Sequence, residues 1–148
     1  MEKQKAIILC IDDDVAGLEA RKELLEISDY EVLTAQSGEQ GLGLFVSRQI
    51  DAVVVDYKMP GMNGDRVARQ MRRVKPDVPI LMLSGYCELA LPELSCVDAF
   101  LSKGESWSTV VFDTGSVAEL AVSIFCSLVG RLETPKPINP GPQGERAV

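Results

Sequence analysis

Acidic, hydroxyl and ammonium side chains recur at the points where apolar runs of this sequence end. Asp12 and Asp13 follow the first run, Asp56 ends another, and Ser84 and Lys103 follow two more. Crowded carboxylates repel one another unless a hard cation neutralises them, and oxygen ligands suit Mg²⁺ or Mn²⁺. A hydroxyl and an ammonium group nearby can bind phosphate oxygens. Together, these residue types predict a metal-assisted site at which a carboxylate receives a phosphoryl group.

Each of these residues alone has a simpler structural explanation. Aspartates can begin a helix, a serine can end a strand, and a lysine can lie on the surface. Asp56 is harder to explain in this way, because a carboxylate that ends an apolar strand needs a partner. The presence of all these groups at several strand ends favours one shared site over independent structural roles.

Five apolar runs, which we expect to form strands, must position these side chains; they span residues 6–11, 32–35, 52–55, 80–83 and 99–101. Three of the runs are continuous rather than alternating, which is typical of parallel strands buried on both faces. Segments with helical spacing lie between most of the runs. This alternation predicts an α/β fold, with a doubly wound parallel sheet between helices. Functional groups in such a sheet collect at the carboxyl ends of the strands.

Capping residues mark several of the expected helices. Ser37 and Gln40 form a capping box that opens the second helix, and Pro76 stops the third. Ser116 begins another capping box, which opens the last and most apolar helix, expected over residues 116–132. The second helix also contains two glycines, which weaken the prediction there.

Length and composition limit the domain organisation. A chain of 148 residues allows one domain, which we expect over residues 1–133. Residues 134–148 are rich in proline and glycine and have no apolar stripe, so a disordered C-terminal tail is expected there.

Charge and cysteine usage exclude several classes of function. The chain has a net charge of −7 and no histidine, which excludes histidine-based catalysis and is unfavourable for nucleic-acid binding. The four cysteines form no CxxC pair, so we expect a reduced, cytoplasmic protein without a zinc ribbon. The longest apolar stretch, residues 117–129, is too short to span a membrane.

Four motifs resemble the receiver domain of two-component response regulators: ILCIDDD, VVVDYKMPGMNGD, ILMLSGY and AFLSKG. The resemblance covers about residues 5–103 and the last helix. It implies a flavodoxin-like (βα)5 fold, with five parallel strands in the order 2-1-3-4-5. It also implies a stand-alone phosphorylation switch rather than an enzyme, with a sensor histidine kinase or phosphotransfer protein as its phosphodonor and no DNA-binding output domain.

The resemblance implies a metal site and a phosphoacceptor. Asp56 matches the aspartate that accepts the phosphoryl group. Asp12 and Asp13 match the acidic pair that holds Mg²⁺ or Mn²⁺, Asp13 directly and Asp12 largely through water. Asp56 and the backbone carbonyl of Lys58 complete the expected ligands.

The remaining matched residues are expected to respond to phosphorylation. Ser84 matches the hydroxyl that contacts the phosphoryl group, Lys103 its salt-bridge partner, and Phe100 the switch aromatic. Gly104 departs from the family pattern, which usually has proline after the lysine. The apolar last helix suggests a homodimer or a downstream protein as partner.

Two alternatives remain open at this point. A degenerate receiver would bind partners without being phosphorylated. A phosphatase resembling the haloacid dehalogenases would use Asp12 as nucleophile and Asp14 as acid and base. That phosphatase family needs an acidic cluster after the lysine, where only Glu105 and Asp113 are available, and it leaves the motif around Asp56 unexplained.

Overall fold

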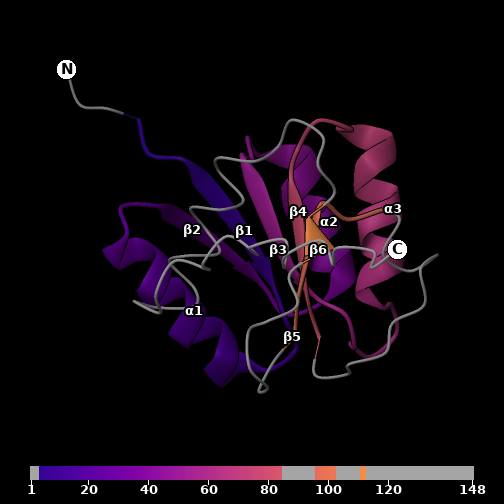
Figure 1. The fold of residues 1–148 in the computed structure, drawn as a ribbon, viewed down its shortest axis with the longest axis horizontal. Coiled ribbons are helices and arrows are strands. Elements are labelled where there is room, and N and C mark those ends of the chain that lie inside the picture. The colour runs from indigo at the N-terminus through magenta and orange to yellow at the C-terminus, as the bar shows by residue number, and fades with distance from the viewer. Residues whose placement is uncertain (1–3, 85–95, 103–110, 113–148) are drawn as a thin grey trace, which may run out of the picture.

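The computed structural model describes residues 4–84, 96–102 and 111–112, which form one sheet with helices packed on it (Figure 1). In chain order the elements are β1 (Ile7–Ile11), α1 (Val15–Ile27), β2 (Glu31–Ala35), α2 (Gly38–Ser47), β3 (Ala52–Asp56), α3 (Gly64–Val74), β4 (Ile80–Ser84), β5 (Ala99–Ser102) and β6 (Val111–Phe112). Lys103, Gly104, the last helix and the tail expected from the sequence lie outside the described residues.

The strands are ordered β2-β1-β3-β4-β5-β6. The first five are parallel to their neighbours, which confirms the predicted flavodoxin-like order. The five parallel strands are extended by a short sixth strand that the sequence did not predict, β6, which pairs antiparallel with β5. Without β6, β5 would be an edge strand with unpaired backbone groups. The β-favouring residues Val111 and Phe112 form the strand that pairs with this edge of β5.

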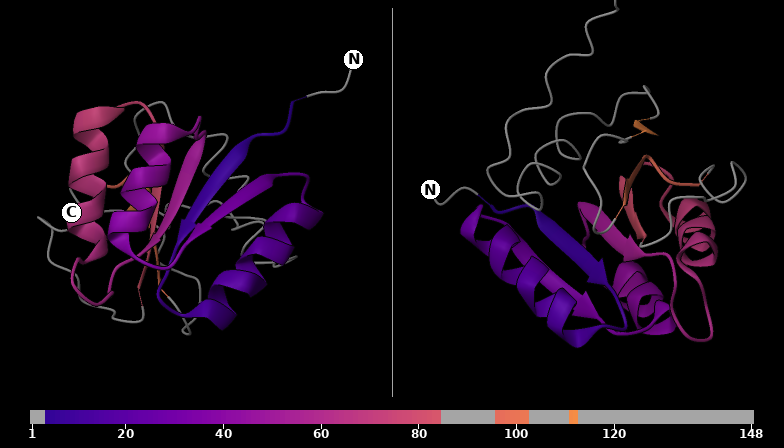
Figure 2. Two further views of the ribbon diagram at one scale, coloured as in Figure 1. Left: turned by 180° about the vertical axis from the view of Figure 1, so that it is seen from behind. Right: turned by 60° about the horizontal axis from the view of Figure 1, so that its bottom comes forward.

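Both faces of the sheet are covered, which explains the continuous apolar composition of β1. Ile8 and Cys10 pack in one cluster with Leu18 and Leu25 of α1. Leu9 and Ile11 belong to the cluster on the opposite face, which also holds the core residues of α2 and α3. Alternate side chains of β1 therefore pack against helix layers on opposite faces of the sheet. The helices α2 and α3 lie side by side in that second layer (Figure 2).

Helix α2 begins as the sequence predicts, with the Gln40 backbone N–H donating to the Ser37 side chain over 3.1 Å. Gly41, one of the two glycines that weakened the prediction of this helix, has a packing role. A Cβ atom at Gly41 would lie 2.3 Å from Cδ1 of Ile11, so glycine lets the helix approach β1 closely. Within the described part of the chain, no helix is long and apolar enough to cross a membrane.

Candidate functional site

Neighbouring strands bring the predicted site residues to one edge of the sheet. Ile11 of β1 is in register with Val55 of β3, so Asp12 and Asp56 follow at adjacent positions. Asp56 is in register with Leu83 of β4, which places Ser84 one residue further along the neighbouring strand. The carboxyl ends of β1, β3 and β4 therefore position three of the predicted side chains at the same edge.

Three carboxylates meet at this edge: Asp12, Asp13 and Asp56 each offer an oxygen within 4.8 Å of the other two. Asp12 is 1% exposed and Asp56 is 7% exposed, whereas Asp13 is open to solvent. Buried carboxylates at this spacing repel one another unless a cation or a proton compensates them. An all-oxygen ligand set with one open side fits Mg²⁺ or Mn²⁺, so these residues suit the predicted metal.

Asp12 also has two partners within the chain. Its Oδ1 atom accepts the backbone N–H of Asp14 over 2.9 Å. Its Oδ2 atom forms an ion pair with the guanidinium group of Arg21 on α1. Arg21 is not among the site residues predicted from the sequence. The available signal was its spacing, three residues after Leu18 and four before Leu25, which places a cation on the buried stripe of the helix.

The loop after Asp56 is held tightly against β3 and β4. The backbone N–H of Tyr57 donates to the carbonyl of Leu83 over 2.8 Å, and the carbonyl of Tyr57 accepts the N–H of Gly64 over 2.7 Å. Met59 is buried in the core, which anchors the loop on one side. Lys58 lies between these fixed points. Its backbone carbonyl therefore belongs to an ordered loop beside Asp56, where the sequence predicts a metal ligand.

The predicted response residues lie on β4 and β5. Ser84 is buried at the end of β4 and is in register with Ser102 of β5. Lys103 follows Ser102 directly and lies outside the described residues. Phe100 is buried and belongs to the core cluster between the sheet and α3. The structure thus places Ser84 beside the acidic cluster and Phe100 in the core below it, while the contacts of Lys103 stay a prediction.

The thiol of Cys10, two residues before Asp12, is expected to be inert in the folded protein. Burial raises the pKa of Cys10 to about 12; the Arg21 charge lowers it and the Asp12 charge raises it, both less than burial does. At pH 8 the folded protein would carry about a thousandfold less Cys10 thiolate than an ordinary thiol does. Iodoacetamide at pH 8, followed by peptide mass spectrometry, should label Cys10 only in urea.

Cys96, which is partly exposed, is the internal control and should be labelled in the native protein. The raised pKa of Cys10 also makes the stability of the protein depend on pH. Because the folded thiol keeps its proton while the unfolded thiol loses it above about pH 9, the free energy of unfolding should fall as pH rises toward 12. Equal native labelling of Cys10 and Cys96 would contradict the burial of Cys10.

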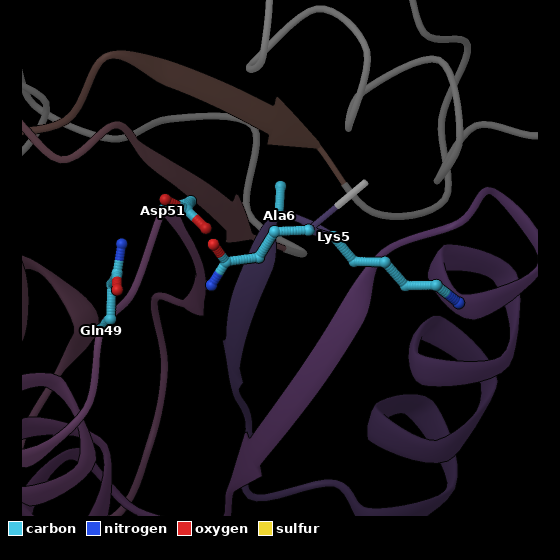
Figure 3. A pocket seen from close by; sticks show the side chains of 5 residues that line it. Lys5, Ala6, Gln49 and Asp51 are labelled. Atoms are coloured by element: carbon cyan, nitrogen blue, oxygen red, sulfur yellow. The ribbon is translucent and has the colours of Figure 1, made fainter. Parts of the chain in front are cut away.

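A hollow lies at the opposite edge of the sheet from the acidic cluster (Figure 3). It measures about 250 Å³ and is lined by Gln4, Lys5, Ala6, Gln49 and Asp51. Asp51 accepts the backbone N–H of Ile7 over 2.7 Å, and Lys5 extends away from it to pair with Asp29. Its charged groups are thus directed to the protein itself, and the carboxyl edge of the sheet remains the stronger candidate site.

Comparison with known proteins gives one consistent result. Residues 8–102 match the family model described as the response regulator receiver domain. The chain is 43% identical over 77 residues to the response regulator MprA of Mycolicibacterium vanbaalenii, a match that covers 52% of this chain and 33% of that protein. The chain therefore spans about a third of the length of the curated relatives it matches.

Solved structures show the same fold. The response regulator TrrA of Thermotoga maritima, in complex with Mg²⁺-BeF, is 30% identical, with a TM-score of 0.66, and the match covers 83% of this chain and 99% of that one. A CheY-like receiver domain from Methanospirillum hungatei is 28% identical, with a TM-score of 0.66, and the match covers 70% of this chain and 85% of that one. In both, the likeness extends over most of the compared receiver.

Proposed function

The chain belongs to the response regulator receiver domain family, and from this premise we propose that it accepts a phosphoryl group on Asp56 with Mg²⁺ or Mn²⁺ bound beside it. Receiver domains are phosphoacceptor switches that interact with histidine kinases or phosphotransfer proteins. The observation that carries the proposal is the meeting of Asp12, Asp13 and Asp56 within 4.8 Å at the carboxyl edge of the sheet.

The proposed transfer uses one carboxylate as the nucleophile. An oxygen of Asp56 attacks the phosphorus of a phosphohistidine, the phosphorus–nitrogen bond breaks, and the histidine leaves with the bonding electrons. Asp12, Asp13 and the carbonyl of Lys58 would hold the metal beside Asp56. When bound, this metal neutralises the carboxylates and the charge of the transferring group. Asp56 is held between β1 and β4, which limits its motion during the attack.

The proposed switch follows from the charge that phosphorylation adds, about −1.5 to −2 at neutral pH. The Ser84 hydroxyl would donate to one phosphoryl oxygen, and Lys103 would pair with another. The register of Ser84 with Ser102, the residue before Lys103, supports this pairing. Movement of β5 toward the phosphoryl group would then change the packing of Phe100, and so the affinity for a partner.

The partners belong to the same proposal. A sensor histidine kinase or a phosphotransfer protein would supply the phosphoryl group in the cytoplasm. A second copy of the chain or a downstream protein would dock on the last helix, outside the described residues. The net charge of −7 supports protein contacts rather than direct nucleic-acid binding as the output.

Each of the two alternatives is less well supported than phosphorylation of Asp56, for a different reason. A phosphatase with Asp12 as nucleophile is disfavoured, because it gives no role to Asp56, which lies in the same acidic cluster. A degenerate receiver is less well supported than a phosphorylated one, because the acidic cluster with Asp56 is complete. The phosphatase would be phosphorylated on Asp12, and the degenerate receiver would not be phosphorylated at all.

Incubation of the full chain with acetyl phosphate and Mg²⁺ is expected to add one phosphoryl group, measured by intact-mass spectrometry. Chelation of the metal with EDTA should suppress the gain, because the carboxylates are then not neutralised. Borohydride trapping and peptide mapping should locate the acyl phosphate at Asp56. A label on Asp12, or no gain from either acetyl phosphate or a kinase phosphohistidine, would contradict the proposal.

A further inference from the structure

The ion pair between Arg21 and Asp12 is largely removed from water. The Arg21 side chain is 15% exposed and the Asp12 side chain 1% exposed. Pairs on the open surface are weakened by solvent and salt, whereas a pair at this burial keeps much of its electrostatic interaction. Arg21 is thus a fixed positive charge that belongs to the acidic cluster.

The first turn of α1 leaves room for this arrangement. Gly17 lies one turn before Arg21, and a Cβ atom there would sit 3.5 Å from both terminal nitrogens of the guanidinium group. The same Cβ atom would lie 2.9 Å from Oδ2 of Asp14. The guanidinium group therefore lies at van der Waals distance from position 17, where the arginine side chain runs back along the helix toward Asp12.

Arg21 affects the acidic cluster through charge. It offsets one of the three negative charges of Asp12, Asp13 and Asp56, which relieves their repulsion before any metal binds. A divalent ion that enters the cluster meets a positive charge already paired with Asp12. If Arg21 stays, the two cations repel each other; if Arg21 leaves, its ion pair is lost. Both cases weaken metal binding.

We propose that Arg21 is an internal cation of the acidic cluster that stabilises the metal-free receiver and lowers its affinity for divalent metal. The inference rests on the proposed function, since it concerns the same metal site. On this proposal, the charge of Arg21 sets the metal concentration at which Asp56 becomes ready for phosphorylation.

Arg21→Gln is expected to raise the affinity for Mg²⁺ about tenfold, as measured by calorimetric titration of the full chain with MgCl₂. Arg21→Lys keeps the charge and should stay close to the wild type. In EDTA, Arg21→Gln should melt at a lower temperature than the wild type, because Asp12 has lost its partner. Saturating Mg²⁺ should reduce this difference in melting temperature, because the metal stabilises the variant more than the wild type.

Arg72→Gln provides a matched control. Arg72 of α3 also pairs with a largely buried aspartate, Asp98, away from the acidic cluster. This variant should lose stability by the same amount in EDTA and in Mg²⁺, with an unchanged Mg²⁺ affinity. If Arg21→Gln does not fold, Arg21→Met keeps the aliphatic volume without the charge and serves the same test.

Two results would overturn the inference, and they differ in what they say about the proposed function. If the wild type binds Mg²⁺ but Arg21→Gln and Arg21→Met bind it equally or more weakly, Arg21 orients Asp12 for the metal and the inference alone is wrong. If neither the wild type nor the variants bind Mg²⁺ at millimolar concentrations, the metal site of the proposed function fails and the inference fails with it.

Discussion

Replacement of Asp56 by asparagine is expected to abolish the gain of a phosphoryl group from acetyl phosphate and Mg²⁺. An amide cannot form the acyl phosphate, and Asp56 is the residue that the loop and two neighbouring strands hold in place. The substitution also removes one of three crowded carboxylates. We therefore expect the metal-free variant to melt at a higher temperature than the wild type and to gain less from Mg²⁺. Intact-mass spectrometry and thermal unfolding with and without Mg²⁺ measure both effects.

Asp51→Asn is the control for this substitution. Asp51 lies just before the opposite end of the same strand, where its carboxylate accepts the backbone N–H of Ile7. The asparagine carbonyl can accept the same hydrogen bond, so folding and phosphorylation should both persist. Phosphoryl incorporation by Asp56→Asn at the wild-type rate would assign the acceptor to another residue.

The fold was predictable where burial imposes a simple pattern. β1 reads as a continuous apolar run because Ile8 and Cys10 face α1 while Leu9 and Ile11 face the other helix layer. The acidic cluster was predictable for a related reason. Parallel strands end at one edge of the sheet, so aspartates that follow β1 and end β3 must lie near each other once these strands are neighbours.

Contacts that depend on close tertiary approach were not predictable in the same way. Arg21 occupies a position where helical spacing suggests an apolar core residue, and only the path of α1 past β1 brings its charge to Asp12. β6 has two residues, too few for a periodic signal, and it forms by non-local pairing with β5. Gly41 looked like a weak point in a helix until the position of Ile11 gave it a reason.

Gly64→Ala is expected to destabilise the protein by about 3 kcal/mol and to slow phosphorylation of Asp56. Gly64 begins α3, and a Cβ atom there would lie 2.4 Å from the backbone oxygen of Asp56 and 3.1 Å from Cα of Tyr57. These are backbone atoms in a hydrogen-bonded segment, so neither can move away as a side chain would. The collision must therefore displace either α3 or the acceptor strand. Urea unfolding and the rate of labelling by acetyl phosphate measure the two effects.

Gly43→Ala separates this collision from the general effect of adding a methyl group to a helix. Gly43 lies inside α2, and a Cβ atom there would meet nothing within 4 Å. Alanine should stabilise the helix by about 0.5–1 kcal/mol and leave phosphorylation unchanged. Changes of opposite sign in the free energy of unfolding of the two variants would show that the start of α3 and the end of β3 are packed backbone to backbone. Wild-type stability in Gly64→Ala would instead mean that the two are farther apart, and that the loop alone positions Asp56.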